Sequence, residues 1–375
     1  MDFDFTDDQE ALRDAVRRFV DGEYAFDRRR QIEHAGGFDR SIWEGLAGLG
    51  LTALAVPEAH GGLGFGAVDA MVVMEELGRG LVMEPLAQVA LIAPALLQHA
   101  PAELQSAWLP KIAGGEALVV LAHQEARARY RLNHVTTRAQ DGKLTGVKSL
   151  VPVGDVADAF IVPARLSGAD DAPQGIALYW VERKAAGVHT RAYSLHDGSR
   201  AAEVHFEDTP AQLIAGPNEG LALLELAVDI GIAAQAAEAV GVMERYLALT
   251  VDYMNTRKQF GVAIGSFQAL RHRTADVKMQ LELARSMSYF ATLRLGDAPA
   301  ARRRALSQAK VQLGQAMRFV GQQCTQLHGG IGVTDEYVGS HYFKRLTVME
   351  MQWGDTLHHL GQVSDRMQET AGVFA

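Results

Sequence analysis

A sixteen-residue stretch at residues 253–268 reads YMNTRKQFGVAIGSFQ and decides the fold of the C-terminal half of this chain. It ends one long apolar helix, makes a turn containing Gly261 and Gly265, and starts another helix. Arg257 and Gln268 stand eleven residues apart across this turn. Four long helical patterns in this half of the chain predict an antiparallel bundle. They cover residues 221–256, 267–295, 299–327 and 340–369.

A second segment, QLHGGIGVT at residues 326–334, has three glycines within four residues. These glycines end a helix and expose backbone N–H groups that an anionic group could approach closely. A plain helix cap is the alternative interpretation of this segment.

Before the bundle, the hydrophobic pattern of the chain changes once, from a helical to a β-strand period. Residues 1–116 read as helices, with capping boxes predicted at Thr6 with Gln9 and at Ser41 with Glu44. Residues 117–216 contain short β-branched runs, and Asp141-Gly142 predicts a hairpin. The runs lie at residues 135–139, 144–147, 159–166, 175–181 and 202–206. We therefore expect an α+β multi-domain protein: an N-terminal helical domain (1–116), a middle β-barrel or sandwich domain (117–216) and a C-terminal antiparallel four-helix bundle (217–375).

The composition narrows the class of protein. The chain has 375 residues, 48% of them hydrophobic, and a net charge of 36 − 45 = −9. A net-negative chain has no general attraction for nucleic acid or anionic lipid, so neither is an expected partner. The single cysteine, Cys324, excludes an intrachain disulfide and a Cys-rich zinc site, and the histidines show no metal-ligand spacing. From these two counts we expect no bound metal. The acidic N-terminus does not resemble a signal peptide, and acidic residues interrupt the apolar residues 221–243, so we expect a cytoplasmic protein.

Together the two glycine-containing segments resemble the acyl-CoA dehydrogenase family of flavoproteins. They match R-x-x-F-G followed by I-x-x-F-Q, and then Q-x-x-G-G-x-G. The stretch PEAHGGLG at residues 57–64 resembles the family's P-E-x-x-G-G-x-G loop. Residues 326–334, 341–346 and 354–355 further resemble the small subunit of pimeloyl-CoA dehydrogenase and related heteromeric enzymes.

The resemblance implies the family's three-domain fold and an FAD-dependent α,β-desaturation of an acyl-CoA thioester. It implies that electron-transfer flavoprotein accepts the electrons, and that six residues bind the pyrophosphate and adenosine of FAD in a neighbouring subunit of a tetramer. Those residues are Arg257, Phe260, Gln268, Gln326, Gly329 and Gly330. An arginine suits this role because its guanidinium presents two N–H groups to phosphate oxygens.

The catalytic base departs from the family pattern. The two positions at which the family carries its glutamate fall at Trp353 and Gly231, and neither residue can take a proton. Asp355, Asp229 and Glu350 are the candidates for a relocated base. The segments that meet the flavin ring in the family are also altered, at residues 122–130 and 150–152.

The residues that would bind a neighbour's FAD match the family, whereas those that would serve this chain's own flavin ring and base do not. This pattern predicts a supporting subunit of a heteromeric, α2β2 enzyme for dicarboxylyl-CoA or another unusual acyl-CoA. Three alternatives stay open. One is a self-sufficient homo-oligomer with a relocated carboxylate base, and the second is a catalytically silent scaffold. The third is a different flavin reaction on the same fold, such as that of an oxidase or a monooxygenase.

Overall fold

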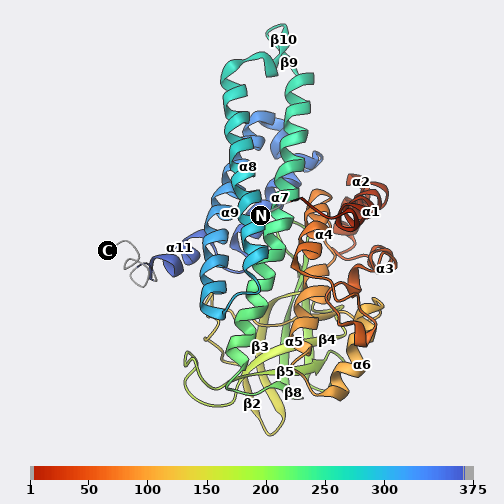
Figure 1. Ribbon diagram of the computed structural model, residues 1–375, viewed down its shortest axis with the longest axis vertical. Coiled ribbons are helices and arrows are strands. Elements are labelled where there is room, and N and C mark those ends of the chain that lie inside the picture. Colours follow the sequence, from red (N-terminus) through yellow and green to blue (C-terminus); the bar gives the residue numbers. More distant parts are fainter. Residues whose placement is uncertain (1–3, 366, 368–375) are drawn as a thin grey trace. The chain divides into compact units, whose positions relative to one another are not determined.

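A computed structural model of the chain describes residues 4–365 and 367 (Figure 1). The chain forms two compact units. The helical unit comprises the described residues of Met1–Arg29, Met71–Val82 and Ile232–Ala375, and the sheet unit comprises Arg30–Ala70 and Met83–Gly231. This division differs from the predicted segments 1–116, 117–216 and 217–375, whose boundaries stay a prediction. The predicted order of a helical N-terminal part, a central β part and a C-terminal helical bundle is confirmed.

Long helices dominate the C-terminal half. They are α7 (Gly220–Thr256), α8 (Gln268–Arg294), α9 (Pro299–His328), α10 (Val338–Met351) and α11 (Thr356–Asp365). The first three begin and end within one residue of the predicted positions. α7 is long and apolar enough to cross a membrane, but 72% of its most apolar window is buried inside the protein, as in a core helix.

The prediction of one continuous fourth helix is wrong. The loop Gln352–Asp355 separates α10 from α11, because Trp353 has a φ of 61° and Gly354 a φ of 107°. Both values lie outside the helical region, so the chain cannot continue as a helix. The predicted end at residue 369 lies outside the described residues.

The N-terminal part is helical, as predicted, with helices in both units. These are α1 (Asp7–Glu23), α2 (Phe26–His34), α3 (Arg40–Gly48), α4 (Ala67–Arg79), α5 (Ala93–Leu97) and α6 (Ala102–Ala113). The capping box of Thr6 and Gln9 is confirmed at the start of α1. The one predicted at Ser41 is wrong: Asp39 caps α3 and accepts a hydrogen bond from the Ser41 N–H at 2.8 Å. A carboxylate is an equally good N-cap, and here it starts the helix two residues earlier.

Within the helical unit, the backbones of α4 and α7 approach each other closely. A Cβ added at Gly78 would lie 2.1 Å from the carbonyl oxygen of Glu238, and one added at Gly241 would lie 1.8 Å from that of Glu75. Only glycine fits at these two positions. The same crossing is flanked by an ion pair between Arg285 of α8 and the buried Glu75, at 2.5 Å.

The sheet unit contains one mixed eight-stranded sheet where a barrel or sandwich was predicted. Its order is β6-β7-β3-β2-β4-β5-β8, with β1 paired to β4. The bounds are β1 Val119–Leu121, β2 Arg138–Gln140, β3 Lys143–Pro152, β4 Ala159–Arg165, β5 Ile176–Glu182, β6 Val188–Ser194, β7 Arg200–Pro210 and β8 Gln212–Ala215. The hairpin at Asp141-Gly142 is confirmed: Gln140 pairs with Lys143, and both turn residues have positive φ. Strands β1, β6 and β8 have no counterpart in the predicted runs.

Candidate functional site

A two-stranded hairpin joins the far ends of α7 and α8 (Figure 1). Strands β9 (Lys258–Gln259) and β10 (Val262–Ala263) flank a two-residue turn in which Phe260 has a φ of 52° and Gly261 a φ of 82°. Left-handed conformations at both positions give the turn type that matches the twist of a hairpin. The Phe260 side chain is 93% exposed, and the Phe267 ring is its aromatic neighbour at 6.1 Å. Val262 and Phe267 are also exposed on this segment, and a group of exposed apolar side chains is typical of a surface that another molecule covers.

Backbone hydrogen bonds hold the residues around Arg257. Its N–H donates to the carbonyl of Tyr253 at 2.8 Å, and its carbonyl accepts from the N–H of Ile264 at 2.9 Å. Arg271 closes the turn by donating from Nε to the carbonyl of Gly265 at 2.6 Å. The Arg257 side chain is exposed, and so is that of Gln268 at the first position of α8. The structure therefore displays a guanidinium and a carboxamide on an ordered backbone.

The glycine-rich segment lies at the end of α9. The helix stops at His328, and Gly329 follows with a φ of 66°, which favours glycine. A Cβ added at Gly329 or Gly330 would meet nothing within 4 Å, and Gln326 is exposed on the last turn of the helix. The backbone here is open to a close approach by a ligand.

A cluster of rings joins the two segments within the helical unit. The His328 ring lies 4.7 Å from that of Tyr253 and 5.1 Å from that of Tyr337. Burial lowers the pKa of His328, and its neutral ring donates from Nδ1 to the carbonyl of Cys324 at 2.8 Å. Because Tyr253 lies one turn before Arg257, this packing brings the predicted FAD residues to one end of the bundle. The expectation of several exposed N–H groups is wrong for Gly329, whose N–H donates to the carbonyl of Gln326. A guanidinium, two carboxamides, an aromatic ring and an open glycine backbone suit a pyrophosphate and an adenosine.

The loop Gln352–Asp355, where the resemblance places the family's base, is held by hydrogen bonds. His359 donates from Nε2 to the carbonyl of Trp353 at 2.9 Å, and its Nδ1 accepts from the Ser307 hydroxyl at 3.1 Å. Burial lowers the pKa of His359 to about 3, so the ring is neutral at pH 7. The buried Lys310 donates from Nζ to the carbonyl of Met349 at 2.7 Å, on the last turn before this loop.

The candidate replacement bases are engaged elsewhere or buried. Glu350 accepts from the backbone N–H and the hydroxyl of Thr356 at 3.0 and 2.6 Å. Asp355 accepts from the backbone N–H of His358 at 2.8 Å, at the start of α11. Asp229 is fully buried in the sheet unit, two residues before Gly231. Glu350 and Asp355 thus fix the loop and the helix after it.

The sheet unit contains an ion pair that sequence reasoning missed. One carboxylate oxygen of Glu125 accepts from Lys148 Nζ at 2.7 Å and from Thr137, and the other accepts from Thr136. Burial raises the pKa of Glu125, but Lys148 and these hydrogen bonds outweigh it and lower the pKa to about 2. Glu125 lies inside the altered residues 122–130, and no signal in the sequence distinguishes it from other surface glutamates; its pairing with Lys148 on β3 is visible only in the structure.

The second altered segment, residues 150–152, includes a bulge in β3. The pairing with β7 shifts register between Lys148 and Val151, and Leu150 has a φ of 54° with its side chain 47% exposed. A bulge of this kind turns a side chain away from the regular alternation of the strand.

The sequence and the fold together identify the class of protein. Residues 6–116 match the N-terminal domain of acyl-CoA dehydrogenases, and residues 218–368 match their C-terminal domain. The chain belongs to the acyl-CoA dehydrogenase family, whose members are oxidoreductases acting on acyl-CoA.

Two relatives come from Mycobacterium tuberculosis. The chain is 29% identical to the acyl-CoA dehydrogenase FadE27, covering 99% of this chain and 100% of that protein. It is 33% identical to the acyl-CoA dehydrogenase IpdE2, covering 82% of this chain and 81% of that protein.

Three solved structures share the fold. A variant of the Tcur3481-Tcur3483 steroid ACAD is 28% identical with a TM-score of 0.87, covering 97% of this chain and 99% of that chain. The ChsE4-ChsE5 complex from Mycobacterium tuberculosis is 25% identical with a TM-score of 0.87, covering 98% and 99%. PigA in complex with FAD is 22% identical with a TM-score of 0.89, covering 98% and 99%, and this likeness shows the fold alone.

Proposed function

We propose that this chain is the supporting subunit of a heteromeric, FAD-dependent acyl-CoA dehydrogenase. One combination of observations carries the proposal. The residues that would bind a neighbouring subunit's FAD are displayed at one end of the bundle, whereas Trp353 and Gly231 occupy both positions of the base. The similarity to the ChsE4-ChsE5 complex supports a second, different subunit.

The residues of this chain have separate tasks toward FAD. Arg257 holds the pyrophosphate through its forked N–H groups, and the bare backbone of Gly329 and Gly330 lets the cofactor approach the end of α9 closely. Gln268 and Gln326 donate and accept hydrogen bonds, and Phe260 covers an apolar part of the cofactor or its subunit. When bound, FAD supplies the acceptor for the β-hydrogen of the acyl-CoA.

In this proposal, a carboxylate of another chain removes the proton from the α-carbon of the substrate. Trp353 has no basic group at neutral pH, and Glu350 and Asp355 already accept hydrogen bonds that hold the loop and α11. A base must be within hydrogen-bond reach of the proton that it removes. A relocated base at Asp355, Asp229 or Glu350 is the competing proposal for the same chemistry, and a silent scaffold is the third.

The proposal also covers the substrate, the oligomeric state, the cellular compartment and the electron acceptor. We infer a dicarboxylyl-CoA or another unusual acyl-CoA from the resemblance of residues 326–334 and 341–346 to the pimeloyl-CoA dehydrogenase small subunit. We further propose an α2β2 tetramer in the cytoplasm, with electron-transfer flavoprotein as the electron acceptor and no role for nucleic acid, membrane or a metal ion.

The test compares the purified chain with the chain co-expressed with a second acyl-CoA dehydrogenase-like subunit. Each is mixed with FAD, octanoyl-CoA or pimeloyl-CoA, and an artificial electron acceptor. We expect flavin absorbance and turnover only from the pair. Turnover by the chain alone, abolished by Asp355→Asn, would establish the relocated base instead. A stable pair that turns over equally well when this subunit carries Arg257→Ala would favour the silent scaffold.

A further inference from the structure

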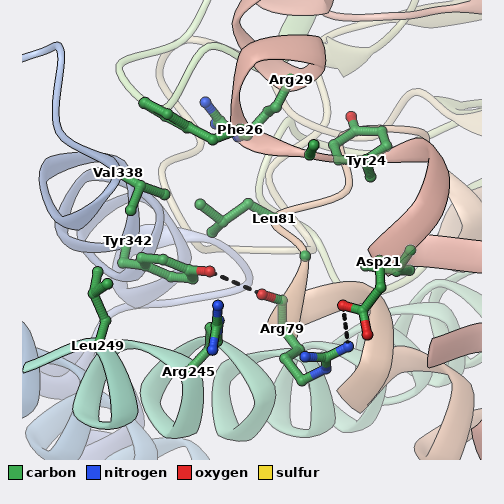
Figure 2. A pocket seen from close by; sticks show the side chains of 13 residues that line it. Asp21, Tyr24, Phe26, Arg29, Arg79, Leu81, Arg245, Leu249, Val338 and Tyr342 are labelled. Atoms are coloured by element: carbon green, nitrogen blue, oxygen red, sulfur yellow. Dashed lines mark hydrogen bonds and ion pairs between the residues drawn. The ribbon is translucent and has the colours of Figure 1, made fainter. Parts of the chain in front are cut away.

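A cavity of about 230 Å³, open to solvent on the side of Arg245, lies in the helical unit (Figure 2). Four segments surround it: the turn between α1 and α2, the end of α4, the middle of α7 and the start of α10. None of its lining residues belongs to the proposed FAD residues or to the loop of the base. Its volume is below the roughly 300–1,000 Å³ of pockets for drug-sized ligands, so it suits only a small molecule.

The lining is positively charged, although the whole chain carries a net charge of −9. Of the lining residues, Arg29, Arg79 and Arg245 are basic and only Asp21 is acidic. Arg79 donates to Asp21 at 2.6 Å and to Glu76 at 2.9 Å, so its charge is balanced. Arg245 extends from α7 into the same space (Figure 2).

The Tyr342 side chain lines the same cavity as the arginines. The Tyr342 hydroxyl donates to the carbonyl of Arg79 at 3.0 Å (Figure 2). Burial raises the pKa of Tyr342, while Arg245, Arg79 and Arg29 each lower it. The arginine that is most enclosed, Arg29, is 2% exposed, and its Nη1 lies 2.8 Å from Nδ1 of His341. A negative charge in this cavity therefore faces Arg245 and Arg29, since Arg79 is already paired with Asp21 and Glu76.

The opposite wall is apolar and includes a strained residue. Leu81 follows α4 with a φ of 56°, and the N–H groups of Leu81 and Val82 donate to the carbonyls of Gly78 and Leu77. This is the helix-ending motif in which glycine is usual, and a leucine there costs about 1 kcal/mol. The Leu81 side chain is 3% exposed and lines the cavity with Phe26 (Figure 2).

We propose that this cavity binds a small organic carboxylate, independently of the flavin site. The carboxylate group accepts hydrogen bonds from the guanidinium groups of Arg245 and Arg29, and its apolar part packs on Leu81. A guanidinium that donates to a carboxylate forms a charge-assisted hydrogen bond, which is about twice as strong as a neutral one. A fully polar anion makes no use of the apolar wall, so an aromatic carboxylate is the matching probe.

Calorimetric titration of the full chain with benzoate tests the proposal, with benzamide as the uncharged analogue. We expect saturable binding of benzoate, a loss of about tenfold or more in affinity for benzamide, and a similar loss for benzoate in Arg245→Ala. Arg245 is exposed, so this variant is expected to fold, and circular dichroism verifies that it does.

Two control variants separate this site from other arginines. Arg257→Ala removes the proposed FAD contact, and Arg318→Ala removes an exposed arginine on α9. Both should bind benzoate with unchanged affinity, whatever the outcome for flavin binding. Absence of saturable benzoate binding, equal affinity for benzamide, or unchanged affinity in Arg245→Ala would each overturn the proposal.

Discussion

The ring of His359 donates a hydrogen bond from Nε2 to the carbonyl of Trp353 at 2.9 Å, and this contact fixes the loop Gln352–Asp355. The contact needs the backbone of Gly354 to pass directly beside the ring. A Cβ added at Gly354 would lie 2.5 Å from His359 Nε2, and the φ of 107° at this position is unfavourable for any other residue. The loop between α10 and α11 thus depends on one glycine and one neutral histidine.

Gly354→Ala should therefore destabilise the helical unit. We expect a loss of about 2–3 kcal/mol, from the strained φ and the displaced imidazole together. Urea denaturation followed by circular dichroism measures the effect. Gly361→Ala is the matched control, because Gly361 lies in α11 with nothing within 4 Å of an added Cβ. That substitution should raise stability by up to about 1 kcal/mol, and an equal response of the two variants would contradict the strain at Gly354.

Glu125→Gln should destabilise the sheet unit at neutral pH. It removes the carboxylate that pairs with Lys148, which is fully buried, and breaking a buried pair typically costs about 3–5 kcal/mol. Glu207→Gln, at an exposed position on β7, should have no measurable effect. The measurement is the urea midpoint of each variant at pH 7.

The same ion pair predicts a dependence of stability on pH. The pKa of Glu125 is lowered from 4.5 to about 2, so its contribution is complete above pH 4.5 and is lost as the pH falls toward 2. The difference in urea midpoint between the wild type and Glu125→Gln should therefore shrink over this window. A difference that stays constant from pH 6 to pH 2 would show that the charge of Glu125 does not stabilise the fold.

Arg257→Ala should lower the FAD content of the assembled complex while this subunit stays folded. A charge-assisted hydrogen bond to phosphate is worth about 1.5–3 kcal/mol, or about tenfold to a hundredfold in affinity. The FAD content with Arg257→Lys should lie between those of the wild type and Arg257→Ala, because lysine keeps the charge but cannot donate two parallel hydrogen bonds. The test is the flavin stoichiometry after gel filtration under dilute conditions. Full occupancy in folded Arg257→Ala would remove the main residue-level support for the interface.

Phe260→Ala should weaken the complex and leave the isolated chain as stable as before. The ring is 93% exposed, so its removal sacrifices almost no buried surface within the chain. We expect the affinity for the second subunit to fall by about tenfold or more, measured by analytical ultracentrifugation, since aromatic anchors are typical hot spots. Val333→Ala, at another exposed apolar position, serves as a comparison for loss of surface hydrophobicity.

Trp353→Glu should not create a competent dehydrogenase by itself. The carboxylate would return to the family's position, but the altered residues 122–130 and 150–152 would still meet the flavin ring differently. Turnover of octanoyl-CoA with an artificial acceptor is the measurement. Strong activity gained by this one substitution would show that the flavin and substrate pockets of this chain are intact.

Local features of this protein can be read from short windows of sequence. The hairpin at Asp141-Gly142, the capping box of Thr6 and Gln9, and the long helices all depend on residues close together in the chain. The family motifs at Arg257 and Gln326 are also visible in short windows of sequence, because they are defined by the spacing of a few residues. Even here neighbouring signals compete: Asp39 replaced Ser41 as the cap of α3, because either side chain can satisfy the first N–H groups.

Only the tertiary structure decided how distant side chains pair. Glu125 and Lys148 meet because β3 places the lysine beside the loop that carries the glutamate, and no local pattern encodes that pairing. The break between α10 and α11 depends on His359, which lies six residues beyond Trp353 and acts on it only after the chain has folded back. The cavity beside Tyr342 is lined by arginines from three separate helices, α2, α4 and α7. Backbone propensity and spacing act within a few residues, whereas burial, ion pairing and cavity shape depend on packing between segments far apart in the sequence.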